Sequence, residues 1–467
     1  MNPITIPNIS IPTIGIPTIG IPSVGFPSAS GGGGLSWPAG MKEHIKAWYD
    51  PKKQGMTNFD VIESYVTDFT TWRTADKNYV GLTIRSSSFS ISFNKVSNHV
   101  IMWKPNYLFN EEGQVKLQVS GITNNISIII KHGTQEFPIV NGVNTFSFTQ
   151  EENKSLSFVC KNVFQDTNIT ITQLPTSILK DLSGNGNHAY LYGGKGKLNS
   201  GMGVYQQDFS NVRGVTTVSA NGFELFREGT GGTYLARISI GYWNNKECKL
   251  LFETNNTSNL YYIRYRKANN DIVTSVRLHN GENIIPAQDD LADVSEVIFE
   301  GALRDNEYIR VTEIPDCPDQ LCYDGKMYAV AYEFPILTDY TVMAERTWFE
   351  NRNVFLAKGN ITTEAKYAFI FERFKPDGVM TVQSFGAWND VVSTTDSCIS
   401  YLTKNKYNGI DIRSGIGADD DMLSIGGALN KGNIELTSVC CHGAIIIADR
   451  SFTEEEINWL KQNWDKI

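Results

Sequence analysis

Residues 115–130 read VKLQVSGITNNISIII, and this stretch decides the fold class. Val115, Leu117 and Val119 alternate with polar residues, which is the period-two pattern of a half-buried strand. A Gly- and Asn-containing turn follows, and then a second apolar run begins at Ile126. The same pattern recurs at 89–93 (FSISF) and 169–171 (ITI), so we expect an all-β protein.

Composition and length agree with several β-rich domains. The chain has 467 residues, 41% hydrophobic and only 19% charged, with 40 Gly and 20 Tyr, which favours strands joined by many turns. The net charge is −9 and no lysine- or arginine-dense run occurs, so we expect no nucleic-acid partner. No stretch has the length and apolarity of a membrane span, and no secretory leader is evident, so we expect no membrane insertion.

The N-terminal segment, residues 1–34, is unlike the rest of the chain. Residues 6–30 form five pentads, IPNIS-IPTIG-IPTIG-IPSVG-FPSAS, and Gly31–Gly34 follow as a flexible joint. A Pro in every pentad prevents helix and central strand, so we expect an extended, polyproline-like segment. Its isoleucines are too apolar for a plain linker, which indicates an anchor buried in a partner or bundled with its own copies. The alternative is an unusual disordered tail.

Two parts of the chain look like copies of one small β-sandwich, residues 67–175 and 204–316. Asp68-Phe69-Thr70 recurs 140 residues later as Asp208-Phe209-Ser210, and Asn141-Gly142 returns as Asn280-Gly281. Order and spacing hold over roughly a hundred residues at low identity, although chance similarity between β-rich stretches is the alternative.

The remaining segments surround these copies. Residues 35–66 are expected to be a short helical or irregular lead-in, with a turn at Trp48-Tyr49-Asp50-Pro51. Residues 181–189 read DLSGNGNHA between the copies, and residues 322–449 give another series of strands. Thr453 and Glu456 form a capping-box pattern that starts a terminal helix, with Ile457, Leu460 and Trp464 on one face.

DLSGNGNHA, the strand pair in 324–344 and the ending DRSFTEEEINWL (449–460) resemble concanavalin-A-like, laminin-G-like jelly rolls. The resemblance covers about 176–203 and 320–467. It implies a jelly roll formed by residues 176–203 and 317–467 that carries the second copy as an insertion. The expected fold is therefore an all-β, multi-domain chain with two small sandwiches, a C-terminal jelly roll with a short terminal helix, and an extended N-terminus. WYDPKKQG together with DLSGNGNHA is also similar to fibre or decoration proteins of crAss-like bacteriophages.

No motif for catalysis stands out. Laminarinase-type enzymes on this fold resemble one another in a Glu-x-Asp-x-x-Glu strand, and here no Glu is followed two residues later by Asp. No G-x-S-x-G, H-E-x-x-H or phosphate-loop pattern occurs either. His188 lies in the SGNGNHA turn and is interpreted as a turn residue. We assign no catalytic, cofactor-binding or metal-ligating residue and expect no enzyme activity.

Four further features of the sequence carry weaker signals. Asp419-Asp420-Asp421 is either a solvated acidic turn or, with loop carbonyls, a Ca²⁺ site. Cys440, Cys441 and His442 lie on one strand and cannot converge on a metal, so we expect buried thiols. Cys317 and Cys322 are expected as free thiols, although they are close enough in sequence to close a small loop. Trp348, Trp388 and Tyr401 are candidates for stacking on sugars, with burial in the core as the preferred reading.

These observations predict a virion protein, a head or tail fibre or a capsid decoration, assembled in the host cytoplasm. Residues 1–34 would contact other virion proteins, and the chain would form a homo-oligomer, with a trimer as our guess. Host-surface glycan is the candidate outside ligand. The alternative is a bacterial cell-surface glycan-binding protein or carbohydrate-active enzyme.

Overall fold

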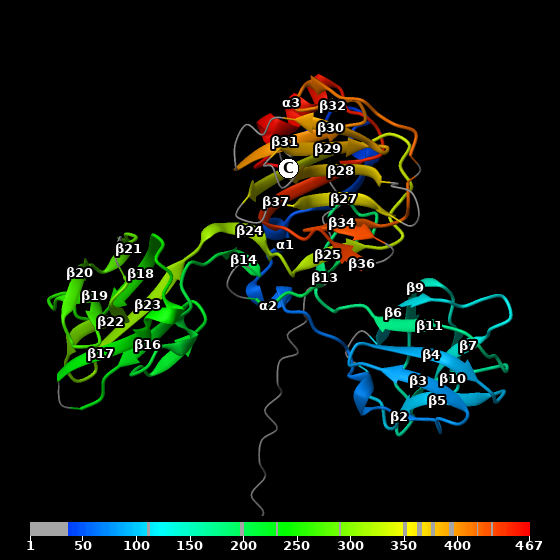
Figure 1. Cartoon of the computed structure of the whole chain (residues 1–467), viewed down its shortest axis with the longest axis horizontal. Coiled ribbons are helices and arrows are strands. Elements are labelled where there is room, and N and C mark those ends of the chain that lie inside the picture. The colour runs from blue at the N-terminus through cyan, green and yellow to red at the C-terminus, as the bar shows by residue number, and fades with distance from the viewer. Residues whose placement is uncertain are drawn as a thin grey trace, which may run out of the picture.

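The computed structural model describes residues 36–467 apart from 110–112, 197–199, 230–231, 289–290, 349–352, 362–366, 375–378, 392–396, 418 and 431–432. Strands make up 51% of the structure and helices 8%, and within the described residues every paired strand is antiparallel except β27 with β35. The expected all-β, multi-domain fold is confirmed. Figure 1 shows three bodies: a large one at the top, a green one at the left and a blue-to-cyan one at the lower right. The expected extended segment, residues 1–34, lies outside the described residues.

The large body is a jelly-roll sandwich of two sheets. One sheet holds β14 (Gly201–Val204), β24 (Asp316–Asp324), β37 (Val439–Ala448), β26 (Thr341–Trp348), β31 (Ser397–Thr403), β32 (Lys406–Tyr407) and β33 (Ile410–Asp411), with β1 (Ile45–Tyr49) paired to β37. The other holds β12 (Ile178–Leu179), β13 (Ala189–Tyr192), β25 (Tyr328–Ala331), β34 (Leu423–Ile425), β27 (Val354–Ile361), β28 (Tyr367–Phe374), β29 (Met380–Ser384) and β30 (Ala387–Val391). In addition, β35 (Ala428–Asn430) pairs with β27, and β36 (Asn433–Glu435) pairs with β35.

At one end of the sandwich, a helix forms a third layer on the outer face of one sheet, and the side chains of the central strand β37 explain why. Its side chains alternate, so Ile445 and Ile447 enter the core between the sheets while Ile446 faces the opposite side. That opposite side is covered by helix α3 (Glu454–Asn463), whose Ile457 and Leu460 are buried against it. The capping box of Thr453 and Glu456 is present as expected, and the terminal helix is confirmed.

The lead-in segment differs from its sequence-based expectation. Residues 45–49 are not part of a helix or a turn: they form strand β1, which pairs with β37 from Ile45↔Ala448 to Tyr49↔Ile445. Only after Asp50 does the chain turn, into the short helices α1 (Pro51–Gln54) and α2 (Asn58–Val61). The expectation failed because a single isolated strand has no pattern of its own, and β37, its partner, lies about 400 residues away.

The first module is the small sandwich formed by β2 to β11. In one sheet the strands follow the order β2 (Arg73–Thr74), β5 (His99–Lys104), β10 (Leu156–Cys160), β7 (Ile128–His132), β8 (Gln135–Pro138). In the other sheet the order is β3 (Val80–Ile84), β4 (Ser88–Asn94), β11 (Ile169–Gln173), β6 (Gln114–Ser120), β9 (Gly142–Ser147). The strands expected at 89–93, 115–119 and 169–171 are confirmed, and the run at 126–130 becomes β7, which begins at Ile128.

The second module, formed by β15 to β23, has matching strand orders. One sheet runs β15 (Thr217–Ser219), β16 (Gly222–Phe226), β23 (Tyr308–Ile314), β18 (Cys248–Thr254), β21 (Gly281–Ile285), and the other runs β17 (Gly232–Ser239), β22 (Val294–Leu303), β19 (Tyr261–Lys267), β20 (Ile272–Leu278). Where β2 pairs with β5 in the first module, the second has a single bridge between Arg213 and Arg237.

Local hydrogen bonds repeat between the two modules. Asp68 accepts from the Thr70 N–H and Asp208 from the Ser210 N–H, each at 2.9 Å, at the start of the 3-10 turns η2 (Phe69–Thr71) and η3 (Phe209–Asn211). The Asn144 side chain bonds to both backbone groups of Val140, and Asn283 bonds in the same way to those of His279. Two further 3-10 turns are η1 (Lys42–His44) and η4 (Ile240–Tyr242).

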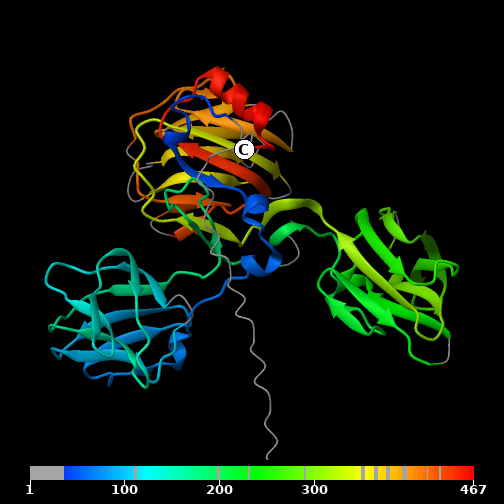
Figure 2. The same ribbon diagram turned by 180° about the vertical axis from the view of Figure 1, so that it is seen from behind.

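For each module, the chain leaves the jelly roll, forms the module, and re-enters the jelly roll close to the point where it left. The first lies between α2 and β12, and the second lies between β14 and β24, which pair with each other. Figure 2, seen from behind, again shows the two modules on opposite sides of the jelly roll. Within the described residues there is no helix with the length and apolarity needed to cross a membrane.

Candidate functional site

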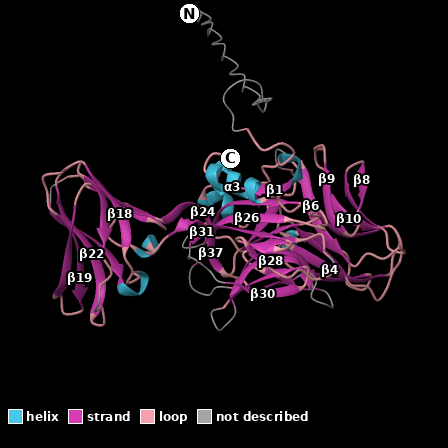
Figure 3. Ribbon diagram, turned by 90° about the horizontal axis from the view of Figure 1, so that it is seen from above, coloured by secondary structure: helices cyan, strands magenta, loops and turns pink. Residues whose placement is uncertain are grey.

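The root of the N-terminal segment, residues 36–49, is the first feature that bears on function. Trp37 lies with its ring centroid 5.1 Å from that of Trp459 in α3. Met41 and Ile45 are 0% and 3% exposed in the same apolar cluster. Figure 3 shows β1 and α3 side by side at one end of the jelly roll. The chain is therefore fixed to the C-terminal helix within three residues of Gly34.

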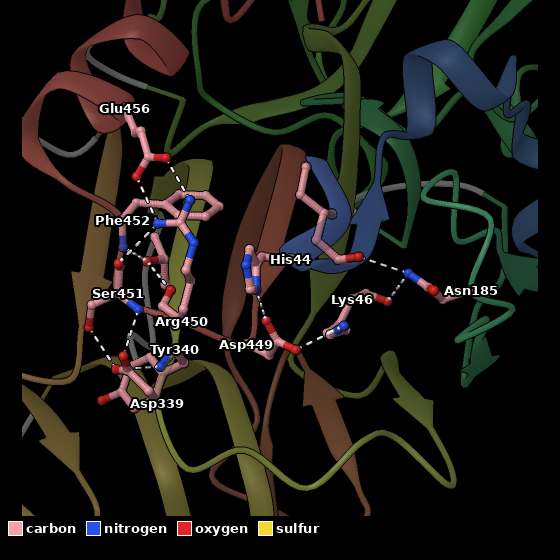
Figure 4. Close-up of polar contacts among 12 residues, drawn as sticks. His44, Lys46, Asn185, Asp339, Tyr340, Asp449, Arg450, Ser451, Phe452 and Glu456 are labelled. Atoms are coloured by element: carbon pink, nitrogen blue, oxygen red, sulfur yellow. Dashed lines mark hydrogen bonds and ion pairs between the residues drawn. The ribbon is translucent and has the colours of Figure 1, made fainter. Parts of the chain in front are cut away.

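Polar contacts hold this root in place. Asp449, directly after β37, lies 2.7 Å from His44 Nδ1 and 2.8 Å from Lys46 Nζ, and Figure 4 shows the three side chains together. Partial burial alone would raise the pKa of Asp449, but the hydrogen bonds from Lys46 and His44 outweigh it and the pKa is lowered. The carboxylate is thus held charged between two basic side chains.

The DLSGNGNHA loop covers the other edge of β1. Asn185 Nδ2 donates to the carbonyl of Ile45 at 2.8 Å, and Asn187 Nδ2 donates to that of Lys46 at 2.7 Å. Asp181 accepts from the Trp48 N–H at 3.0 Å. His188 Nδ1 accepts from the Asp181 N–H at 3.0 Å, which agrees with its interpretation as a turn residue. An edge strand with unpaired backbone groups is thereby closed.

The C-terminal end is fixed by a second set of contacts, also drawn in Figure 4. Arg450 binds Glu456 through two nitrogen–oxygen contacts of 2.6 and 2.8 Å, and its guanidinium lies over the ring of Phe452. Asp339 accepts from the backbone and hydroxyl of Ser451 at 2.9 and 2.7 Å. Both ends of the jelly roll therefore meet in one ordered region.

Of the three aromatic candidates for sugar stacking, two are core residues. Trp348 and Tyr401 are 3% and 4% exposed, so no ligand reaches their faces. Trp348 Nε1 donates to Glu372 at 3.0 Å inside the sandwich. Trp388 is different: it is 36% exposed on the edge strand β30, with the Arg373 guanidinium 5.2 Å from its ring centroid.

The acidic turn at 419–421 contacts the side chain of a lysine, Lys358, on strand β27. Lys358 Nζ lies 3.0 Å from Asp419 Oδ1, and both side chains are fully buried. Burial lowers the pKa of Lys358 and raises that of Asp419, while the opposite charge of each partner acts against the shift. Asp419 is therefore one half of an internal ion pair, and the interpretation as a solvated acidic turn is wrong for this residue. Within the described residues no three His, Cys, Asp or Glu side chains are grouped around a position for a metal ion.

The cysteine prediction needs one correction. Cys322 and Cys441 form a disulfide, whereas the sequence was interpreted as giving free thiols at both positions. They lie directly opposite each other on β24 and β37, with Cα atoms 4.1 Å apart, and their sequence separation of 119 positions conceals this pairing in the sequence. Cys440 is a buried thiol, as expected, and Cys317 is a half-buried one.

Among the pockets lined by described residues, two of similar volume lie beside the jelly roll. One, of about 400 Å³, contains Lys52, Asp319, Glu345 and Trp464, and Lys52 Nζ lies 2.6 Å from Asp319. The other, of about 430 Å³, lies where the first module meets β12 and β13 and includes Lys116, Gln173 and Tyr190. Each pocket mixes apolar and polar walls, and a pocket of this size admits a small ligand.

Comparisons with known proteins identify no family. No protein-family model matches the chain, and no curated protein matches it. Two solved structures of Trypanosoma rangeli sialidase, one in complex with the inhibitor DANA, align with 83% of this chain and 84% of theirs at 9% identity. Their TM-scores are 0.24 and 0.23, so this similarity carries no structural or functional conclusion.

Proposed function

We propose that this chain is a non-enzymatic structural protein of a bacteriophage virion, a head or tail fibre or a decoration protein. Residues 1–34 dock into other virion proteins, the three β bodies project outward, and the exposed domains contact host-surface glycan. The assembled form is a homo-oligomer, and a trimer is the state we propose.

The five apolar-Pro pentads carry this proposal. They place Ile6, Ile11, Ile16 and Ile21 in a segment that Pro excludes from helix and central strand, so their apolar surface needs shelter from outside. The root supports the same reading, because Trp37 packs on Trp459 and gives the segment a fixed point of departure.

The body supports projection. Both modules are sandwiches with their own cores, attached to the jelly roll at their ends, and they extend away from it on opposite sides. Several copies of such a body on one particle would present many identical surfaces, and avidity would strengthen a weak glycan contact.

The test uses particles assembled with altered pentads. Replacing Ile6, Ile11, Ile16 and Ile21 with Ser should abolish incorporation into virions, because the apolar contact is lost while every Pro stays in place. The matched control replaces Asn8, Thr13, Thr18 and Ser23 with Ala, and it should assemble normally. Both purified variants should unfold at the wild-type temperature. Normal incorporation of the serine variant would contradict the proposal.

The rival reading, a bacterial cell-surface glycan-binding protein, rests on Trp388, whose half-exposed ring on an edge strand suits stacking on a sugar. Immunogold labelling separates the two functions: label on particles supports the virion protein, and label on the envelope of uninfected cells supports the rival. Turnover of a polysaccharide by the purified chain would contradict the non-enzymatic part.

A further inference from the structure

The second module carries a row of arginines across the outer face of its four-stranded sheet. The register pairs Arg237 on β17 with Ile298 on β22, and Ile298 with Arg264 on β19. Arg213 bridges to Arg237 on the far side. Residues directly opposite one another share a sheet face, so these three arginines lie in one line across three strand spacings, about 14 Å.

Two more arginines extend this line into a surface. Arg277 on β20 lies opposite Tyr262, and Arg266 lies opposite Glu296. We call Arg213, Arg237, Arg264, Arg266 and Arg277 the arginine face. The register places two carboxylates among them, Glu296 and Glu300. Five arginines and two glutamates give this face a net charge of +3. The chain as a whole has a net charge of −9, so this face has the opposite sign.

Three arginines of the arginine face, Arg237, Arg264 and Arg266, already have carboxylate partners. Arg237 Nη1 lies 3.9 Å from Glu296 and Arg264 Nε lies 3.2 Å from Glu300, with 41% and 31% of the arginine side chains exposed. Ile298 between them is only 2% exposed, since the aliphatic parts of the arginines cover it. Arg264 also lies over the Tyr262 ring at 5.1 Å. Ordered guanidiniums lose little conformational entropy when they bind an anion.

The face is accessible within the chain. The second module joins the jelly roll through β14 and β24, and it lies apart from the other two bodies in Figures 1 to 3. The first module offers an internal comparison: the equivalent row there reads Arg73, Trp103, Ser157, Lys131, Glu136, which ends in a carboxylate and has a single arginine. The arginine face is therefore particular to the second module.

We propose that the arginine face binds a carboxylate-bearing polysaccharide, such as one built from uronic or sialic acid units. This deepens, and rests on, the proposed contact with host-surface glycan by naming the ligand class and the residues. The planar guanidinium fork binds carboxylates through two hydrogen bonds, and the Tyr262 ring suits the apolar face of a sugar. A flat row about 14 Å long fits an extended polymer better than a single small anion. The broad polyanionic surface of a nucleic acid or a membrane would also face the acidic remainder of the chain, whereas a single polysaccharide strand can contact the arginine face alone.

Binding of the full-length protein to polygalacturonate, measured by calorimetry at low salt, tests this assignment. The double variant Arg237→Gln/Arg264→Gln should bind about tenfold or more weakly, because two charge-assisted contacts are lost. The matched control is Arg310→Gln on the opposite sheet of the same module, where Arg310 pairs with Glu224, and its affinity should equal that of wild type. Glu300→Gln removes a competing carboxylate and should strengthen binding several-fold, an effect that damage to the fold would not give.

Neutral dextran and duplex DNA complete the experiment. No binding to either supports the proposal, whereas equal binding of dextran or DNA would overturn it in favour of general sugar or polyanion binding. Wild-type affinity in the double variant, or no binding to polygalacturonate at all, would also overturn it. Particle incorporation of the wild-type protein is scored separately. Wild-type protein that is incorporated normally but does not bind polygalacturonate would overturn this site alone and leave the proposed virion role untouched.

Discussion

At the scale of single residues, the interior of the jelly roll holds charges that only their partners make tolerable. Arg346 with Glu372, and Lys358 with Asp419, are fully buried ion pairs. Tyr407 also donates to Glu372 at 2.8 Å, so that carboxylate is bound from several sides. Buried pairs of this kind contribute little net stability, but removing one partner is costly because it leaves the other charge in a medium of low polarity.

Asp419→Asn should therefore lower the free energy of unfolding by about 3 kcal/mol or more, since Lys358 loses its carboxylate partner. The double variant Lys358→Met/Asp419→Asn should recover much of this loss because no buried charge remains. Urea unfolding of the three proteins measures both effects. Because Lys358 supplies the positive charge, EDTA or added Ca²⁺ should leave the wild-type unfolding curve unchanged. A clear shift with Ca²⁺ would show that the acidic turn holds a metal.

Glu313, at the base of the second module, gives a pH dependence with a defined sign. Burial raises its pKa from 4.5 to about 7, against hydrogen bonds from the N–H groups of Gln206 and Gln207, while Asp316 adds to the rise. The folded state therefore favours the protonated carboxyl, so its stabilising effect is complete below about pH 4.5 and is lost as the pH rises towards 7. The expected loss is about 3 kcal/mol.

The measurement is the stability of wild type and Glu313→Gln between pH 4.5 and 8. The wild-type protein should lose stability relative to the variant as the pH rises through this window, and the difference should level off above pH 7. The first module supports the choice of Gln, since Gln173 stands at the equivalent place and bonds to both backbone groups of Thr67. Parallel pH profiles for the two proteins would refute the assigned role of Glu313.

At the scale of elements, β1 is the strand that connects the N-terminal segment to the body. It pairs with β37 on one edge, and the DLSGNGNHA loop bonds to its other edge. Asp181 is central to that loop because it accepts from the N–H groups of Trp48, Ser183 and Asn187 at 2.9–3.0 Å. The characteristic residues of the loop thus have a structural task, the closure of an edge strand.

Asp181→Ala should lower the free energy of unfolding by about 3 kcal/mol, since three backbone donors lose a charged acceptor at a buried position. The control Asp76→Ala removes a single exposed hydrogen bond to Asn78 and should change stability by less than about 1 kcal/mol. Hydrogen exchange should also become faster at residues 45–49 in the Asp181 variant alone. Unchanged exchange there would show that the loop does not hold β1.

Local patterns in the sequence were enough to predict some elements and not others. Strands such as Val115–Val119 and helix α3 carry their signal in a few adjacent residues: alternation in one case, a capping box in the other. Other features depend on partners far away in the chain, so no local pattern predicts them. These are strand β1, the Cys322–Cys441 disulfide and the Lys358–Asp419 pair. The arginine face was missed for another reason. Alternation in YYIRYRK places Tyr262, Arg264 and Arg266 on one face, but a search for dense basic runs overlooks charges spaced two residues apart.

At the scale of the whole molecule, the chain places its distinct surfaces at separate positions. The root beside α3 receives the N-terminal segment, and the arginine face lies on a module that stands away from the jelly roll. In the proposed virion protein this separation lets one end stay docked while another contacts glycan. Oligomers would multiply the arginine face, and this is the physical advantage we expect from a trimer.

The central claim is that residues 6–30 bury their isoleucines in a partner, and hydrogen exchange of intact particles tests it most directly. Amides of these pentads should exchange orders of magnitude more slowly in the particle than in the free protein, while amides of the modules exchange alike in both. Equally fast exchange of the pentads in particle and free protein would contradict the claim.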